Sequence, residues 1–196
     1  KLNKEIRSKI ALFCNVDEDS VMEALDADTF YEVPLMFAKN GFDEIVSKKL
    51  RLRSTKPNMS TWTKFVHKIK SPRHTVQIGF VGKYIKHQDA YKSIVEALIH
   101  AGAINDARIQ MKWIDSEEIT PENVADTLRG LHGLVVAPGF GSRGVEGKIQ
   151  AIRYVRENNI PFFGICLGMQ CAVIEFARNV CGLPQANSRE FSRTKQ

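Results

Sequence analysis

The chain has 196 residues, of which 43% are hydrophobic and 26% charged, and this composition is that of an ordinary globular protein. No window approaches 18 consecutive apolar residues, and the charged opening KLNKEIRSKI lacks the apolar core of a signal peptide, so we expect no membrane association and a cytoplasmic location. The four cysteines have neither metal-site nor disulfide-framework spacing, which predicts free thiols in a reducing compartment.

The net charge of +6 is concentrated between residues 48 and 73, where nine Lys or Arg residues occur without one Asp or Glu. Three interpretations fit this pattern: a solvated linker, a nucleic-acid patch, and an attractive surface for a polyanionic ligand such as a nucleotide phosphate. Ser, Thr, Pro and Asn are interspersed, and aromatic residues do not recur as a base-stacking surface would require. We therefore favour the linker and expect no nucleic-acid partner.

The region before this basic segment predicts few regular elements. Residues 9–16, KIALFCNV, form a short apolar run that predicts a buried strand containing Cys14. The acids of VDEDSVMEAL, residues 16–25, are typical of a helix start. Residues 29–41 are apolar on one face, and residues 42–50 predict a further short helix. One strand and a few helices cannot close a sheet, so this region is expected to be the end of a larger domain.

From residue 74 onward, expected strands and helices alternate along the chain. The expected strands are 74–82, 108–115 and 160–166, and residues 132–141 are expected to be a strand that enters a glycine-rich loop. The expected helices are 89–102, 120–131, 144–158 and 168–180. Gly102 is expected to end the first helix, and Thr120 with Pro121 to begin the second. This alternation predicts an α/β fold with a mainly parallel sheet and flanking helices.

Three segments follow from these patterns. Residues 1–53 are expected to be the remainder of a larger domain, residues 54–73 a basic linker, and residues 74–196 part of an α/β domain. Ligands of parallel sheets bind at the carboxyl ends of the strands. Two glycine-rich stretches, 138–144 and 164–168, are expected at such ends.

Cys166 lies in the second of these stretches, within GICLG. It is either a small buried hydrophobic residue at a corner or a nucleophile on a sharp strand-to-helix turn, and a helix N-terminus would favour its thiolate. PGFGSRG, residues 138–144, offers backbone N–H groups of the kind that form an oxyanion hole. The two stretches together favour the nucleophile. Structural roles are expected for Cys14, Cys171 and Cys181.

At these residues the chain resembles a known family. GICLGMQ and APGFGSRG resemble the class I glutamine amidotransferases, and GKYIKHQDAYKS, YEVPL and ANSREF narrow the resemblance to the CTP synthases over nearly the whole chain. The resemblance implies a class I glutaminase with flavodoxin- or Rossmann-like layers, preceded by the tail of a P-loop-type synthetase domain. It also implies an enzyme that releases ammonia from glutamine and uses it, with ATP and Mg²⁺, to convert UTP to CTP.

The resemblance assigns roles around the thiol. Cys166 matches the nucleophile that forms a γ-glutamyl thioester, and Gly139 with Phe140 lies in the loop that supplies oxyanion and glutamine contacts. Glu190 matches the acid that binds the α-amino group of glutamine. The glutamine pocket is further matched by Leu167, Gly168, Met169 and Gln170.

Nucleotide contacts are implied for other positions. Lys9 matches a lysine that meets the pyrimidine nucleotide, and Leu25, Asp26 and Ala27 match residues beside the adenine of ATP. GTP is implied as an allosteric activator, with Lys92 and Phe140 as its candidate contacts. The alternatives are a solvated lysine for Lys9, a plain loop for 25–27, a solvated helix residue for Lys92, and a ring that merely closes its loop for Phe140.

Departures from the family pattern limit these implications. Ala137-Pro138 stands where many relatives have Pro-Gly, and no phosphate-cradling loop or Mg²⁺ carboxylate pair is present, so no metal ligand is expected in this chain. All five histidines precede Cys166, whereas the family's catalytic His and Glu follow it. The chain is thus expected to stop before them. Two hypotheses follow: part of a functional ligase, or a non-catalytic fragment or scaffold that retains a glutamine- or nucleotide-binding surface.

The partners implied by the resemblance are small molecules and further copies of the chain. They are glutamine, UTP, ATP and GTP, with CTP as a product inhibitor. A homotetramer is also implied, and filament formation is left open.

Overall fold

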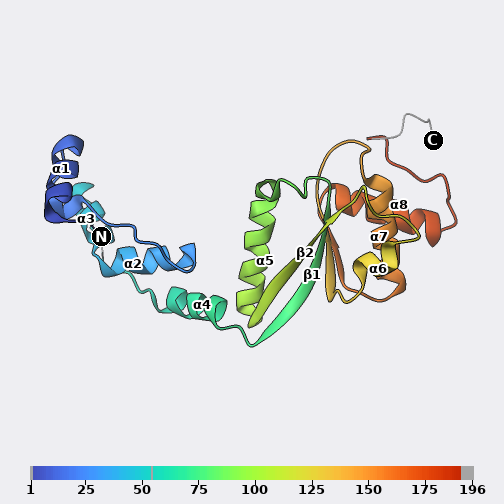
Figure 1. Cartoon of the computed structure of the whole chain (residues 1–196), viewed down its shortest axis with the longest axis horizontal. Helices are drawn as coiled ribbons and strands as arrows, with labels where there is room; N and C mark the ends of the chain where they lie inside the picture. The colour runs from blue at the N-terminus through green and yellow to red at the C-terminus, as the bar shows by residue number, and fades with distance from the viewer. Residues whose placement is uncertain (1, 54, 191–196) are drawn as a thin grey trace. The chain divides into compact units, whose positions relative to one another are not determined.

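The computed structural model describes residues 2–53 and 55–190 (Figure 1). Its contacts divide the chain into two compact units, Lys1–Ser71 and Pro72–Gln196. Among the described residues, no helix is both long enough and apolar enough to cross a membrane.

The first unit is helical. Its elements are α1 (Lys4–Cys14), η1 (Glu18–Ser20), η2 (Phe30–Glu32), α2 (Val33–Lys39), α3 (Phe42–Lys49) and α4 (Ser60–Lys70). The helices expected within 29–41 and 42–50 are confirmed. Helix α4 lies within the stretch expected to be a linker, and it packs on η2: Trp62 Nε1 donates to the Tyr31 carbonyl over 2.8 Å, and Phe65 meets the Tyr31 ring edge-on.

The strand expected over residues 9–16 is wrong, because these residues belong to α1 and the turn that follows it. The Asn3 side chain accepts a hydrogen bond from the Ile6 N–H over 2.8 Å, which caps the helix before the apolar run begins. The helix ends at Asn15, whose backbone is left-handed. Cys14 is therefore exposed at a helix end. A short apolar run does not by itself distinguish a strand from a helix.

The helix expected over residues 16–25 is also wrong, because only the short turn η1 forms there. Val21 is extended, and its carbonyl accepts a hydrogen bond from the Arg7 guanidinium of α1. The Glu23 carboxylate accepts from the Leu2 N–H. The Arg7 bond satisfies the Val21 carbonyl, a backbone group that a continued helix would have satisfied locally.

The second unit contains a four-stranded sheet in the order β2-β1-β3-β4. Its strands are β1 (His74–Gly82), β2 (Ala107–Asp115), β3 (Gly133–Val136) and β4 (Phe162–Gly164). Every pairing is parallel, which confirms the expected α/β class. In register, Gly82 is opposite Asp115, and Val136 is opposite Gly164. The carboxyl ends of the strands therefore meet at one edge of the sheet.

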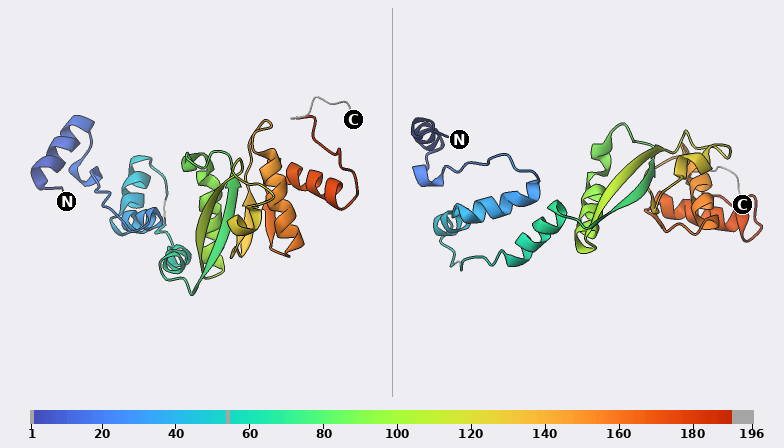
Figure 2. Two further views of the ribbon diagram at one scale, coloured as in Figure 1. Left: turned by 45° about the vertical axis from the view of Figure 1, so that its right-hand side comes forward. Right: turned by 60° about the horizontal axis from the view of Figure 1, so that its bottom comes forward.

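Helices cover both faces of this sheet (Figures 1 and 2). They are α5 (Lys92–Ile104), preceded by η3 (Gln88–Tyr91), then α6 (Val124–Leu128), α7 (Val145–Glu157) and α8 (Leu167–Asn179). Helix α5 packs on the face that presents Phe80 and Val135. Helices α6, α7 and α8 pack on the face that presents Val81 and Val136. This alternation along the strands is the two-residue period of the pleat.

Helices α5 and α6 differ from their expected bounds by more than one residue. Helix α5 continues through Gly102, where a Cβ would overlap the Ala107 carbonyl oxygen, so this glycine allows close approach to β2 rather than ending the helix. Helix α6 begins only at Val124. The Thr120 N–H donates to Asn123 Oδ1 over 2.9 Å, which closes a turn where the first helical turn was expected.

Candidate active site

Cys166 lies on the turn between β4 and α8, with its backbone at φ 51° and ψ −105°. This positive φ, combined with a ψ outside the left-handed helical region, is unusual for a residue with a side chain, and such strain clusters at functional sites. The thiol is exposed. Gly164 and Gly168 permit the turn: a Cβ at 164 would lie 2.6 Å from the carbonyl carbon of Gly168, and a Cβ at 168 would overlap the Val136 carbonyl oxygen.

The thiol is at the N-terminus of α8. Cys166 is the residue before the helix, and the buried Leu167 is its first residue. Among the described residues, the Leu167 N–H has no backbone acceptor, whereas the Gly168 N–H donates to the Ile165 carbonyl over 2.9 Å. A free N–H and the positive end of the helix dipole are thus available beside the sulfur, and both stabilise negative charge.

The loop after β3 lies beside this turn. The Ile165 N–H donates to the Val136 carbonyl over 3.0 Å, one residue before the loop begins. Gly139 has φ 148°. Within the described part of the chain, the backbone N–H groups of Gly139, Phe140 and Gly141 donate no backbone hydrogen bond. The loop therefore offers free donors at the same strand ends as the thiol, as an oxyanion site requires.

Two lysines beneath the loop were not identified from the sequence. Lys148 Nζ donates to the Ala137 carbonyl over 2.8 Å and is completely buried, and Lys83 Nζ donates to the Phe140 carbonyl. Burial lowers the pKa of Lys148. Lys148 lies on the buried face of α7 with Val145. A lysine at an apolar position of the helical pattern is therefore the feature by which the sequence could have identified it. No sequence signal marked Lys83.

The expected glutamine-pocket residues are partly brought together. Met169 is half-exposed, whereas Gln170 and Glu190 approach each other through Ser188. The Ser188 hydroxyl donates to Gln170 Oε1 over 3.4 Å and accepts from the Glu190 N–H over 3.2 Å. Glu190 is exposed and is followed by residues outside the described range, so the Phe191 end of the ANSREF match lies outside it too.

The candidate effector residues of the second unit are both exposed. Lys92 is the first residue of α5, and Phe140 presents 82% of its surface to solvent in the loop after β3. The Lys92 ammonium and the Phe140 ring are therefore accessible to a ligand, and no contact between them is described.

The candidate nucleotide residues of the first unit are separated. Asp26 and Ala27 line a hollow of about 390 Å³ that also includes Lys70. Lys70 Nζ lies 2.7 Å from both Asp28 and Glu32, so it fixes one wall of the hollow. Leu25 is half-exposed, and Lys9 is an exposed residue of α1 that is not part of the hollow. The described residues contain no cluster of three or more groups able to hold a metal ion.

Comparison with known protein families shows which family the chain belongs to. Residues 86–196, more than half of it, match the family model described as glutamine amidotransferase class-I. The chain belongs to this family. Residues 1–52 of the chain match a second model, described as the CTP synthase N-terminus.

Curated relatives support the same relationship. A CTP synthase of Oleidesulfovibrio alaskensis is 57% identical over 187 residues, which are 95% of this chain and 34% of the relative. One of Methanocaldococcus jannaschii is 55% identical over 196 residues, with shares of 97% and 36%. The amidotransferase thus spans about a third of the length of these relatives. The matches do not favour the non-catalytic alternative.

A solved structure agrees with the fold. The glutaminase domain of Trypanosoma brucei CTPS with bound acivicin is similar at a TM-score of 0.56 and 44% sequence identity. The similarity covers 59% of the amidotransferase and 45% of that chain. The expected class I glutaminase fold is therefore confirmed.

Proposed function

We propose that the amidotransferase acts within a glutamine-hydrolysing CTP synthase. The observation that carries the proposal is the exposed Cys166 on a strained turn at the start of α8. It occurs in a chain whose first part matches the CTP synthase N-terminus and whose second part matches a class I amidotransferase. The order of these parts fits an enzyme that produces ammonia in one domain and consumes it in another.

The proposed reaction begins at the thiolate of Cys166. The sulfur attacks the side-chain amide carbon of glutamine, the C–N bond of the resulting tetrahedral intermediate breaks, and ammonia leaves with a transferred proton. Water then hydrolyses the γ-glutamyl thioester to glutamate and restores the thiol. The proton transfers need a general base and acid. None of the five histidines follows Cys166, so the family's histidine is not among the residues of this chain.

The loop and the helix start supply the remaining parts of the glutamine site. The free N–H groups of Gly139 and Leu167 are the proposed donors to the oxyanion of the intermediate. Phe140 lies beside them in the loop. Met169 and Gln170 line the side-chain pocket, and Glu190 binds the α-amino group as the resemblance implies.

The proposed synthetase reaction converts UTP to CTP with this ammonia. ATP bound with Mg²⁺ would supply the activation of UTP for this amination. In this chain, Asp26 and Ala27 border a hollow whose lining includes Leu35 and Met36, and an adenine edge fits such a mixed surface. Leu25 and Lys9 are proposed neighbours of the adenine and of the pyrimidine nucleotide. No described residue is assigned to Mg²⁺.

The proposal includes regulation and assembly implied by the family resemblance. GTP activates glutamine hydrolysis, with Lys92 available to a phosphate and the exposed Phe140 ring available to the base. CTP inhibits as the product. The enzyme is a cytoplasmic homotetramer.

The test requires an enzyme of the relatives' length that contains this sequence, which is called the full-length enzyme below. Cys166→Ala should abolish CTP formation from glutamine while CTP formation from added ammonia is retained, because free ammonia bypasses the thioester. Loss of both activities would contradict a catalytic role for Cys166. An unsubstituted full-length enzyme that forms no CTP from either nitrogen source would contradict the proposed function.

A further inference from the structure

Two buried ammonium groups hold the loop that follows β3. Lys148 Nζ, on α7, donates to the Ala137 carbonyl over 2.8 Å. Lys83 Nζ, directly after β1, donates to the Phe140 carbonyl. Lys148 is completely buried, and Lys83 is 6% exposed. The carbonyl oxygens at both ends of the segment 137–140 are therefore each bound by a buried cation.

A buried ammonium is costly to keep, because it loses its water shell. One carbonyl replaces only part of that shell at Lys148, whereas Lys83 Nζ also lies 5.4 Å from the centre of the Tyr84 ring. Among the described residues, neither Lys83 nor Lys148 forms an ion pair with a carboxylate. Burial is the main cause that lowers the pKa of Lys148, and the charge of Lys83 lowers this pKa further. The nearby Cys171 and Cys166 act in the opposite direction. Two buried lysines bonded to carbonyls of one loop indicate a role for the loop rather than for packing alone.

Pro138 links the Ala137 carbonyl, which Lys148 binds, to the peptide that carries the Gly139 N–H. The peptide between Ala137 and Pro138 is planar, so fixing the Ala137 oxygen fixes the whole unit. The proline ring then sets φ close to −65°. Only ψ of Pro138 remains free between this fixed peptide and the peptide that carries the Gly139 N–H. The departure from Pro-Gly to Ala137-Pro138 thus couples the lysine to the proposed oxyanion donor.

Lys83 acts from the other side of the same donor. Gly139 rests on the aliphatic part of Lys83, since a Cβ there would lie 3.0 Å from Lys83 Cε. The bond to the Phe140 carbonyl also orients the following peptide, whose N–H belongs to Gly141, because C=O and N–H point in opposite directions in a trans peptide.

We propose that Lys148 and Lys83 are positioning residues of the glutaminase, which hold the segment 137–140 so that its free N–H groups keep a fixed place beside Cys166. The inference rests on the proposed function and adds residues to its glutamine site. Negative charge develops on the amide oxygen of glutamine only as the tetrahedral intermediate forms. A loosened loop therefore lowers kcat more than it weakens glutamine binding.

The experiment compares Lys148→Met and Lys83→Met in the full-length enzyme, because methionine fills similar space without the charge. We expect kcat for glutamine hydrolysis to fall about 10- to 100-fold in each variant, with KM changed less than about threefold. CTP formation from ammonia and alkylation of Cys166 by iodoacetamide should stay within about twofold, since neither needs an oxyanion donor. Arg153→Met is the control, because Arg153 is an exposed cation on the same helix as Lys148.

A second variant tests the coupling through proline. In a Pro138→Gly background, the additional effect of Lys148→Met on kcat should shrink, because a flexible residue no longer transmits the hold of the lysine. An undiminished effect would overturn the transmission through Pro138.

Three results would overturn the positioning role. The first is an unchanged kcat in both lysine variants. The second is alkylation of Cys166 that slows as much as hydrolysis, since the lysines would then act on the thiol itself. The third is a parallel loss of ammonia-dependent CTP formation, since they would then maintain the fold. An unsubstituted enzyme without glutaminase activity would instead contradict the proposed function.

Discussion

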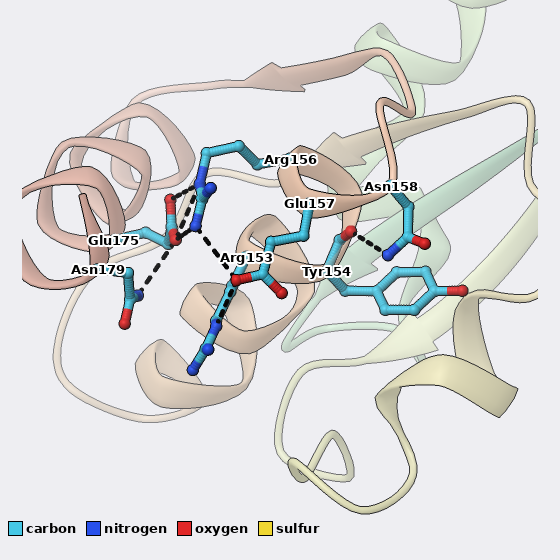
Figure 3. Close-up of polar contacts among 7 residues, drawn as sticks. All are labelled: Arg153, Tyr154, Arg156, Glu157, Asn158, Glu175 and Asn179. Atoms are coloured by element: carbon cyan, nitrogen blue, oxygen red, sulfur yellow. Dashed lines mark hydrogen bonds and ion pairs between the residues drawn. The ribbon is translucent and has the colours of Figure 1, made fainter.

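Arg156 on α7 and Glu175 on α8 form a forked ion pair that ties the two helices together (Figure 3). Arg156 Nη2 lies 2.7 Å from Glu175 Oε1, and Nε lies 2.9 Å from Oε2. The Glu175 side chain is only 1% exposed, and Asn179 Nδ2 donates to the same carboxylate over 3.1 Å. Because Cys166 directly precedes α8, an ion pair that fixes α8 against α7 also helps to fix the position of the thiol.

Arg156→Met should destabilise the second unit by leaving the Glu175 carboxylate buried without its cation. We expect a loss of about 3 kcal/mol in the free energy of unfolding, at the low end for a broken buried pair because Arg156 is 34% exposed. Urea unfolding followed by circular dichroism measures this change. Adding Glu175→Leu should recover much of the loss, and a double variant as unstable as the single one would contradict the explanation.

Gly168→Ala should displace the start of α8 from β3. A Cβ at 168 would overlap the Val136 carbonyl oxygen, a backbone atom that cannot move without distorting the sheet. We expect a loss of about 2 to 3 kcal/mol in unfolding free energy. Gly182→Ala is the matched control: its left-handed φ of 69° costs about 1 kcal/mol, but it has no atom within 4 Å of an added Cβ. Equal losses in both variants would argue against close packing at Gly168.

Cys166 should react with iodoacetamide about tenfold faster than the other cysteines at neutral pH, because it alone lies at a helix N-terminus. Cys14 is exposed at the C-terminal end of α1, and Cys181 is exposed just after α8, so neither lies beside the free N–H groups of a helix start. Cys171 is buried. Peptide mapping after a brief exposure gives the four rates, and equal labelling of Cys14 or Cys181 would exclude the reactive-turn interpretation.

The buried thiol of Cys171 should make stability depend on alkaline pH. Burial raises the pKa of Cys171 from 9.0 to about 11, so its thiolate is disfavoured in the folded state. Its contribution is complete below about pH 9 and is lost as pH rises towards 11, by at most about 2 to 3 kcal/mol. Cys171→Ala should remove this loss. The measurement is urea unfolding of both proteins near pH 8 and near pH 10.5, where their stability difference should change.

The opposite contribution comes from Lys148, whose pKa is lowered by burial: the folded state loses the lysine proton more readily than the unfolded state, so stability rises as pH rises towards the ordinary pKa of lysine. Comparing the two proteins at each pH separates the thiol from this lysine. A stability difference that does not vary with pH would refute a shifted Cys171.

Lys92→Ala in the full-length enzyme should raise the GTP concentration needed for activation of glutamine hydrolysis. The removed ammonium is exposed at the start of α5, so we expect little effect on folding. CTP formation from ammonia should be nearly unchanged, since that route does not need glutamine hydrolysis. Unaltered GTP dependence would remove Lys92 from the effector site, whereas an equal loss of ammonia-dependent activity would indicate damage to the fold.

The sequence by itself determined the alternating part of the fold and the reactive turn. Strands β1, β3 and β4 combine an apolar run with glycine at or just after their carboxyl ends, β2 alternates polar and apolar residues, and the helices between them carry apolar spacing or start signals, so local pattern and tertiary packing agree there. Gly164 and Gly168 flank Cys166 within the same short stretch. The turn could therefore be predicted from adjacent residues alone.

Only the tertiary structure decided the first unit and the support of the loop. Residues 9–14 are helical within α1, which Asn3 caps upstream, and the extended Val21 gives its carbonyl to Arg7 instead of to a helix. Lys83 and Lys148 are 65 positions apart in sequence, and nothing local joins them. The parallel sheet brings the end of β1, the loop after β3 and the face of α7 together, and that proximity alone places both ammonium groups on one loop.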